Sequence, residues 1–354
     1  MAVQTGSILL YIALLLLCVG SAYYAEKKDT LQIVLLSVLI ISLVAGLRGD
    51  GVGLDTPTYN RIFELLMQGK IDAVHGAEVT FKYITRLFLL IFQSIPAVFF
   101  VYALLTNGLM ILRLWDFRKR ICFPVAIACY YAAFYFFTLN IMRQCVAIAI
   151  VFFATRYLEK NKIFVFLVGV LVASLFHQSA LLGILYLLIC YKGWRNLAMR
   201  MNLSKRKRRI LYVTALLAVV FVLIWKASKY IHYFLEVSPH FGLLLPTKIV
   251  AVLLWATLTG RGTKKNTDAF LCQDILKCYL LGLFLSLAGY FYPFMDRIGL
   301  YFTVCESIFL GYVYKEYDAK VIRTIVVLWI VVPFAIDVCS GGQGQLPYYF
   351  FWNS

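Results

Sequence analysis

Long apolar runs recur from one end of the chain to the other, and they constrain the fold more than any other feature. The hydrocarbon core of a bilayer is roughly 30 Å thick, so a helix needs about 20 mostly apolar residues to cross it. Apolar residues make up 62% of this chain and charged residues 14%. A soluble domain has roughly 45–50% apolar and about 25% charged residues. The sequence therefore predicts an all-α, polytopic integral membrane protein.

The apolar runs predict about twelve transmembrane helices within one integral membrane domain that covers residues 1–354. No internal repeat, proline-rich linker or soluble domain interrupts them. No basic segment precedes the first run, which is therefore predicted to be a retained span and not a cleaved signal. The predicted spans are residues 6–25, 31–46, 97–115, 121–138, 141–158, 163–176, 180–191, 210–226, 243–259, 275–291, 298–314 and 321–338.

The net charge of +17 is distributed as the positive-inside rule expects, because most basic residues lie in short connectors. This placement favours anionic membrane lipid as the partner and argues against nucleic acid. The basic connectors can share the cytoplasmic side only if the segment 78–95 does not cross. Lys82 and Arg86 lie four residues apart on one face of that segment, where contact with lipid is costly. We therefore predict that 78–95 is a re-entrant or interfacial amphipathic helix on the outer face, with both termini outside. The basic connectors are residues 27–28, 118–120, 160–162, 192–209, 261–265 and 315–323.

The sequence predicts neither a metal nor a cofactor. The nine cysteines fall mostly inside apolar runs without CxxC spacing, which is typical of small core residues. The four histidines show no HExxH spacing, and the chain has neither a GxxxxGKS phosphate loop nor a nucleotide-binding βαβ pattern.

Four polar motifs interrupt the apolar pattern, and the predicted topology puts all of them on the outer side. They are GLRGDGVGLDTPTYNRIFE after the second span, TLNIMRQ, SLFHQSA and YFYPFMDRIGLYF. Glycines in the first motif allow tight turns and a close approach to a ligand. The polar residues that we single out are Arg48, Asp55, Thr56, Tyr59, Asn140, Arg143, Gln144, His177, Ser179, Asp296 and Arg297.

Three arginines among these residues point to an anionic ligand at the outer membrane surface. Arginine stays charged and binds phosphate oxygens in a bidentate fork. Arg143 is the strongest candidate, because it lies in an apolar stretch on the side that the positive-inside rule disfavours. Together with Arg48 and Arg297 it suits a lipid pyrophosphate.

Each motif also has a purely structural interpretation. Arg48 could extend from a helix end to lipid headgroups, and His177 could pair with a backbone carbonyl. Asp55 or Thr56 is expected to cap a helix over 57–68 that has Pro57 in its first turn. Asp296 and Arg297 could form a local ion pair.

The order of these motifs resembles the EpsG family of exopolysaccharide polymerase proteins, distant relatives of the Wzy O-antigen polymerases. The resemblance covers essentially the whole chain. One departure is Leu54, where the family's first motif more often has a threonine. The residues that carry the resemblance are Arg48, Gly53, Asp55, Thr56 and Tyr59, then Asn140, Arg143 and Gln144, then His177, Ser179 and Ala180, and finally Arg297.

The resemblance implies a membrane glycosyltransferase that joins polyprenyl-pyrophosphate-linked oligosaccharide repeats at the outer leaflet of the bacterial cytoplasmic membrane. Polysaccharide export or chain-length proteins are further expected partners. Arg143, Arg48 and Arg297 would hold the pyrophosphate, and His177 or Asp55 would accept the proton of the acceptor hydroxyl. The sequence leaves open whether the product is capsule, O-antigen or secreted polysaccharide.

Two other function classes fit parts of the pattern. A transporter or flippase of lipid-linked sugars would also want basic residues in a polar cavity, but it often shows repeat symmetry and charges near mid-membrane. A membrane O-acyltransferase would use an embedded histidine, yet it gives no reason for three arginines.

Overall fold

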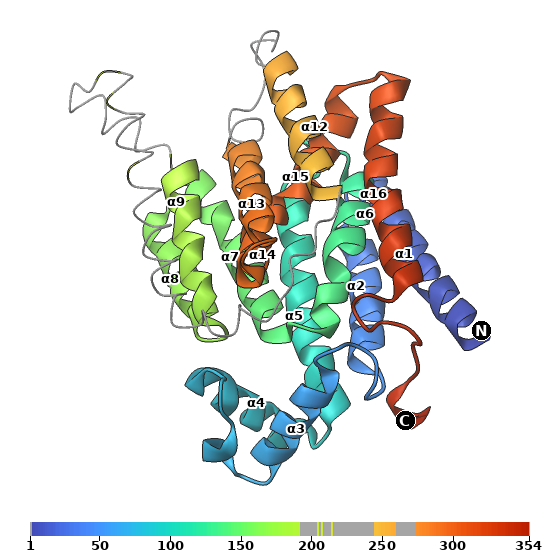
Figure 1. Cartoon of the computed structure of the whole chain (residues 1–354), viewed down its shortest axis with the longest axis vertical. Helices are drawn as coiled ribbons and strands as arrows, with labels where there is room; N and C mark the ends of the chain where they lie inside the picture. Colours follow the sequence, from blue (N-terminus) through green and yellow to red (C-terminus); the bar gives the residue numbers. More distant parts are fainter. Residues whose placement is uncertain are drawn as a thin grey trace. The chain divides into compact units, whose positions relative to one another are not determined.

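The computed structural model describes residues 2–191, 204, 207, 214, 244–259 and 274–353. Most of these residues are helical, and none of them forms a β-strand; an isolated bridge pairs Arg48 with Phe350. The α-helices are α1 (Ala2–Lys28), α2 (Leu31–Gly46), α3 (Thr56–Met67), α4 (Val79–Phe92), α5 (Ile95–Asp116), α6 (Phe123–Phe134), α7 (Met142–Glu159), α8 (Ile163–Ser174), α9 (Ile184–Cys190), α12 (Leu244–Thr259), α13 (Leu276–Ala288), α14 (Pro293–Thr303), α15 (Cys305–Glu316) and α16 (Lys320–Ser340). The 3-10 turns are η1 (Ile71–Ala73), η2 (Tyr135–Leu139), η3 (Gln178–Gly183) and η6 (Phe351–Asn353) (Figure 1).

The helices group into two compact units. The first unit comprises Met1–Phe153, Gly169–Leu181 and Glu306–Ser354, and the second comprises Ala154–Val168 and Leu182–Cys305. The prediction of one integral membrane domain is untested by this grouping, because several chain segments connect the units. Three of the four polar motifs lie in the first unit.

In the first unit, α1 packs on α2 and α6, α2 packs on α5, and α16 packs on α6. Apolar side chains make up most of this core, and most of its buried polar groups are hydrogen-bonded, as burial away from water demands. The Asn107 side chain, for example, donates to Ser42 Oγ at 3.0 Å and accepts from the Tyr130 hydroxyl at 2.5 Å. Tyr135 stacks on Tyr131 at 4.7 Å between ring centroids.

Gly46 sets the closest approach between α2 and α5. A Cβ atom at this position would lie 2.5 Å from Phe100 Cα, inside the contact distance of two carbon atoms. We therefore expect Gly46→Ala to push the two helices apart and to lower the free energy of unfolding by about 1–3 kcal/mol. Thermal unfolding of the purified protein in detergent measures this change. Gly108→Ala is the matched control, because Gly108 lies in α5 with nothing within 4 Å of its Cβ position. An equal loss in both variants would contradict the role given to Gly46.

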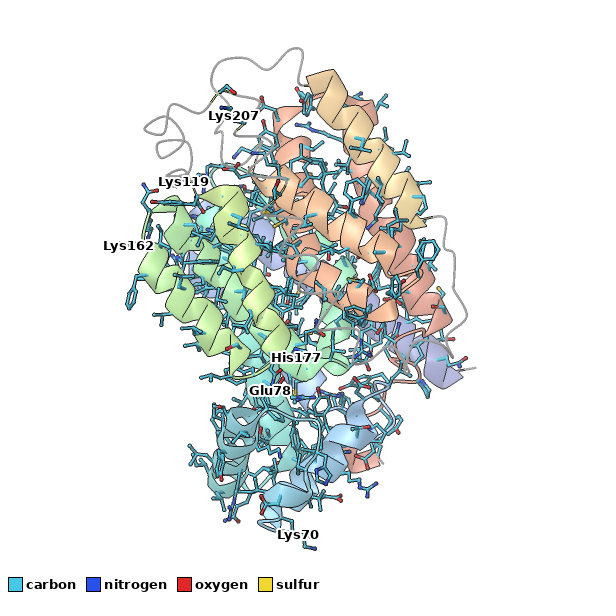
Figure 2. All side chains as sticks on the ribbon, turned by 60° about the vertical axis from the view of Figure 1, so that its left-hand side comes forward. Lys70, Glu78, Lys119, Lys162, His177 and Lys207 are labelled. Carbon is cyan, nitrogen blue, oxygen red and sulfur yellow. The ribbon has the colours of Figure 1, made fainter. Side chains whose placement is uncertain are left out.

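The basic connectors of the first unit meet at one end. Arg118 Nε donates to Asp29 Oδ1 at 2.6 Å, next to the basic last turn of α1, and Lys315 Nζ donates to the carbonyl of Lys119 at 2.7 Å. The connectors 27–28, 118–120 and 315–323 therefore share one end, as the charge pattern predicts. The polar motifs begin where α2 ends, at the other end of this unit. Figure 2 shows Lys119 far from Glu78 and His177.

The segment 78–95 forms the short helix α4, which packs beside α3 and against the start of α5. Phe81 and Leu89 are buried, and Thr85 Oγ1 bonds the Tyr102 hydroxyl on α5 at 2.7 Å. Since α2 ends and α5 begins at the same end of the unit, the chain between them returns to its starting side (Figure 1). This arrangement agrees with a segment that does not cross, and the interfacial position of α4 stays a prediction.

The second unit contains a tightly packed pair of helices, α13 and α14. A Cβ at Gly282 would lie 2.7 Å from the backbone nitrogen of Thr303, and one at Gly299 would lie 2.6 Å from Ser286 Oγ. Buried Cys190 and Cys278 lie nearby, with their sulfurs 3.6 Å apart. The burial of these two cysteines agrees with the prediction that most cysteines are small core residues.

Most predicted spans match helices to within a few residues, and two details differ. The span predicted at 298–314 is two helices, because α14 ends at Thr303 and α15 begins at Cys305. Asp296 and Arg297 consequently lie inside α14 and not in a connector. The helix begins at Pro293, and proline is favoured at a helix start because its backbone angle already suits the first turn. Three predicted segments lie outside the described residues, except for the single positions 204, 207 and 214. They are the span 210–226, the basic connector 192–209 and the connector 261–265.

Among the described residues, three helices are long and apolar enough to cross a membrane, namely Gln4–Lys28, Ile95–Asp116 and Lys320–Ser340. Five shorter apolar helices accompany them in the described part of the chain: Leu31–Gly46, Phe123–Leu139, Ile163–Ser174, Gln178–Cys190 and Leu276–Ala288. The number of about twelve spans stays a prediction.

Candidate functional site

Arg48 lies just beyond α2 and is almost fully buried, with 2% of its surface exposed. Its Nε donates to Thr56 Oγ1 at 3.0 Å, its Nη1 donates to the carbonyl of Ala45, and its guanidinium lies 4.0 Å from the centroid of the Phe99 ring. Burial lowers the pKa of Arg48 to about 10, so the group stays cationic at neutral pH. Arg48 thus ties the end of α2 to the start of α3 and to α5. It does not extend to a headgroup in this structure.

Thr56 is the first residue of α3, and its hydroxyl lies within hydrogen-bonding distance of three groups, among them the carbonyl of Leu139 at 3.5 Å. It donates to the carbonyl of Val52 at 2.6 Å and accepts from Arg48. The preceding turn depends on Gly53, which has φ = +92° and whose Cβ would lie 2.6 Å from the carbonyl oxygen of Leu139. These contacts fix the loop that carries Asp55.

We expect Thr56→Val to lower the free energy of unfolding by about 1–3 kcal/mol, because it leaves a buried charged donor, Arg48 Nε, without an acceptor. Thr56→Ser keeps the hydroxyl and should retain most of the stability. Thr58→Val, at an exposed position of the same helix, is the control. Denaturant or thermal unfolding measures all three variants. A loss in Thr58→Val as large as that in Thr56→Val would show that the hydroxyl is unimportant.

Asp55 occupies the N-cap position of α3, and Pro57 lies in the first turn, both as predicted. The Asp55 side chain, however, makes no cap hydrogen bond. The Thr56 hydroxyl is bonded to Val52 and Arg48 instead. The half-buried Asp55 carboxylate takes no hydrogen bond or ion pair from the described residues, so it is open to a ligand.

Asn140 holds the backbone of this loop from the start of α7. Its Oδ1 accepts from the backbone nitrogens of Leu54 at 2.6 Å and Asp55 at 3.4 Å, and its Nδ2 donates to the carbonyl and to Oε1 of Gln343, each at 3.0 Å. Asn140 is buried, so it presents Asp55 without facing solvent itself. The adjacent Gln144 is buried as well.

Arg143 reaches the site from the first turn of α7 with 18% of its side chain exposed. Its Nη1 lies 2.5 Å from Glu78 Oε2, and its Nη2 donates to the carbonyl of Gly76 at 3.2 Å. Its Nε is buried with no partner among the described residues. The guanidinium is therefore partly exposed and not fully hydrogen-bonded in this structure.

Tyr59 connects Asp55 with Arg143. The Tyr59 backbone nitrogen donates to the carbonyl of Asp55 at 3.0 Å, and the Tyr59 hydroxyl accepts from the backbone nitrogen of Arg143 at 3.5 Å. Burial raises the pKa of the Tyr59 hydroxyl, which keeps it protonated. The backbones of Asp55 and Arg143 therefore belong to one hydrogen-bonded network.

His177 and Ser179 join this network through a backbone contact. Ser179 Oγ lies 2.6 Å from His177 Nδ1, so a hydroxyl and not a carbonyl pairs with this ring nitrogen. Between them, the backbone nitrogen of Gln178 donates to Glu78 Oε1 at 3.0 Å. Figure 2 shows Glu78 beside His177. Glu78 thereby links the Arg143 guanidinium to the segment that carries His177.

The predicted site residues are divided between the two units. Asp296 and Arg297 belong to the second unit, and their contribution to the site stays a proposal. Within the first unit, Arg143, His177, Ser179 and Asp55 are partly exposed, whereas the others are buried supports. The described residues contain no group of three His, Cys, Asp or Glu side chains arranged as metal ligands.

Sequence reasoning missed Glu78 and the C-terminal segment 341–353. Gln343 holds Asn140, the Tyr349 hydroxyl accepts from the backbone nitrogen of Gly51 at 2.7 Å, and Tyr348 bonds the carbonyl of Val44 at 2.8 Å. The polar, glycine-rich and aromatic stretch GGQGQLPYYFF that follows the last span was the available signal. For Glu78 the available signal was an acidic residue at the start of the segment 78–95 that was predicted to lie on the outer face.

Comparison with known proteins agrees with the resemblance in the motifs. The family model described as "EpsG family" matches residues 31–350. No curated protein and no solved structure matches the chain. The matched range contains every residue of the site described above. The chain therefore belongs to the EpsG family, which implies an integral membrane protein with an exopolysaccharide polymerase-type function.

Proposed function

We propose that this protein is a membrane glycosyltransferase that joins polyprenyl-pyrophosphate-linked oligosaccharide repeats at the outer leaflet of the cytoplasmic membrane. One observation carries the proposal. At the end of the first unit that lies away from the basic connectors, Tyr59 hydrogen-bonds the backbone of Arg143, whose guanidinium is partly exposed, and the backbone of Asp55, whose carboxylate no described residue engages. The arginine cation would stabilise the negative charge of a leaving pyrophosphate, and the open carboxylate would accept the proton of an acceptor hydroxyl.

The proposed reaction transfers the growing chain from its lipid carrier. The acceptor hydroxyl of one lipid-linked repeat attacks the anomeric carbon of the chain carried by another. The bond from that carbon to the pyrophosphate oxygen breaks, and the polyprenyl pyrophosphate leaves with the electron pair. The hydroxyl proton passes to a base. The pyrophosphate linkage is already activated, so the step needs no nucleotide.

Arg143 is the residue that we assign to the pyrophosphate. Its unpartnered Nε adds a donor beyond the two nitrogens already engaged. A guanidinium fixed beforehand stabilises charge that develops on the leaving group, which is usually the largest catalytic effect. Arg297 is a further proposed pyrophosphate contact, on the basis of its motif in the sequence.

Asp55 is the preferred general base, and His177 is the second candidate. The Asp55 carboxylate is partly exposed, and the described residues leave both of its oxygens open to an acceptor hydroxyl. His177 has one ring nitrogen committed to Ser179. Arg48, Thr56 and Asn140 are then positioning residues that hold the Asp55 loop, and Gln144, Ser179 and Asp296 are further proposed substrate contacts.

A reconstituted assay tests the function directly. The purified full chain is incubated in liposomes with lipid-linked repeats, and the products are separated by length on a gel. A ladder of products supports the polymerase. If no ladder forms while the same liposomes move the lipid-linked sugar between leaflets, the proposal fails and a flippase replaces it.

A further inference from the structure

The Glu78 carboxylate occupies the position at which the proposed function needs an anion. It faces Arg143 Nη1 at 2.5 Å, and only 14% of its side chain is exposed. Glu78 also stands at the N-cap position of α4 without making a cap hydrogen bond. Its carboxylate is directed to the arginine and not to its own helix.

The contact leaves the guanidinium incompletely satisfied. A bidentate pair would engage both carboxylate oxygens with the arginine, whereas here Glu78 Oε1 accepts from the backbone nitrogen of Gln178 at 3.0 Å. Arg143 Nη2 has a backbone carbonyl, and Nε has no partner in the described part of the chain. A pyrophosphate offers more oxygens and more charge than one carboxylate oxygen, so it is able to displace Glu78.

We infer that Glu78 is an internal counter-anion that holds Arg143 until the pyrophosphate of the substrate displaces it. This inference rests on the proposed function. Displacement also breaks the bond from Glu78 to Gln178, which lies between His177 and Ser179. Occupation of the anion position thereby releases the segment that carries His177. Glu78 is a regulatory residue in this scheme, because it does not touch the reacting atoms.

Glu78→Gln removes the competing charge and keeps an oxygen that accepts from Gln178. We expect this variant to bind inorganic pyrophosphate more tightly by about tenfold, the change that 1.4 kcal/mol gives. We also expect a lower KM for the lipid-linked repeat. Isothermal titration calorimetry on the purified full chain measures the first effect, and the ladder assay measures the second.

Glu64→Gln is the matched control, because Glu64 is exposed on α3 and its loss changes the net charge equally. It should leave pyrophosphate affinity unchanged. Unchanged or weaker affinity in Glu78→Gln overturns the inference, since a residue that only braces Arg143 would lower affinity when it is replaced. An equal gain in Glu64→Gln overturns it too, because a general charge effect would then suffice.

A second measurement needs no variant. In the wild-type protein, inorganic pyrophosphate should speed amide hydrogen exchange at Gln178, which loses its acceptor. Slower or unchanged exchange contradicts the inference even if Glu78→Gln does not fold. The two proposals fail separately: a ladder without any Glu78 effect defeats only the counter-anion, whereas tighter binding without a ladder defeats only the polymerase.

Discussion

Arg143→Ala is expected to lower the rate of chain extension by about 10²–10³-fold, the usual cost of removing one donor that stabilises developing charge. The cause is the loss of the guanidinium that contacts Glu78 and Gly76 at the open edge of the site. Arg143→Lys restores the charge but not the planar fork, so only part of the activity should return. The gel ladder from lipid-linked repeats, followed over time, measures both variants.

Arg61→Ala is the control for this prediction, because Arg61 is exposed on α3 of the same unit. It should extend chains at the wild-type rate. Removing Arg143 also leaves Glu78 without its cation, so thermal unfolding must accompany the assay. A folded Arg143→Ala protein with a normal ladder would show that the leaving group is stabilised elsewhere.

Asp55→Asn is the second change with a large expected effect, a loss of about 10²-fold or more in the extension rate, as for other general bases. Asparagine has nearly the same shape and is also favoured at an N-cap, so α3 should form normally. The loss therefore reflects the missing proton acceptor. Initial rates of the ladder reaction at saturating repeat measure it.

Asp72→Asn is the control for the loss of a negative charge, because Asp72 is exposed in η1, in the same segment between α2 and α5. His177→Ala discriminates between the two candidate bases. If Asp55→Asn stays active and His177→Ala instead loses about 10²-fold or more of the extension rate, the base is the histidine. Circular dichroism of each variant shows whether the helices persist.

Much of the helical pattern could be predicted because hydrophobicity is a local property. The span 31–46 agrees with α2 at both ends, and 321–338 differs from α16 by at most two residues. The break between α14 and α15 was missed, since an uninterrupted apolar run hides a change of direction. The split of the described helices into two units depends on contacts between distant segments, which no local pattern contains.

The candidate site was predictable as a set of residues but not as a set of roles. Polar side chains in apolar surroundings are costly, so Arg48, Asn140 and Arg143 stand out in the sequence. The sequence does not show how deeply each of them is buried. In the structure, Arg48 and Asn140 are buried and brace the loop, whereas Arg143 is partly exposed.

The sequence by itself determined the membrane environment, the helical class and the family, because each follows from composition, run length and motif order. Only the tertiary structure decided that Glu78 engages Arg143, that Asp55 stands at the N-cap of its helix without a side-chain cap hydrogen bond, and that Gln343 holds Asn140 from the far end of the chain. Hydrogen bonds and ion pairs require atoms within about 3–4 Å. Chain separations of 65 and 203 residues are brought to such distances only by packing of the helices between them.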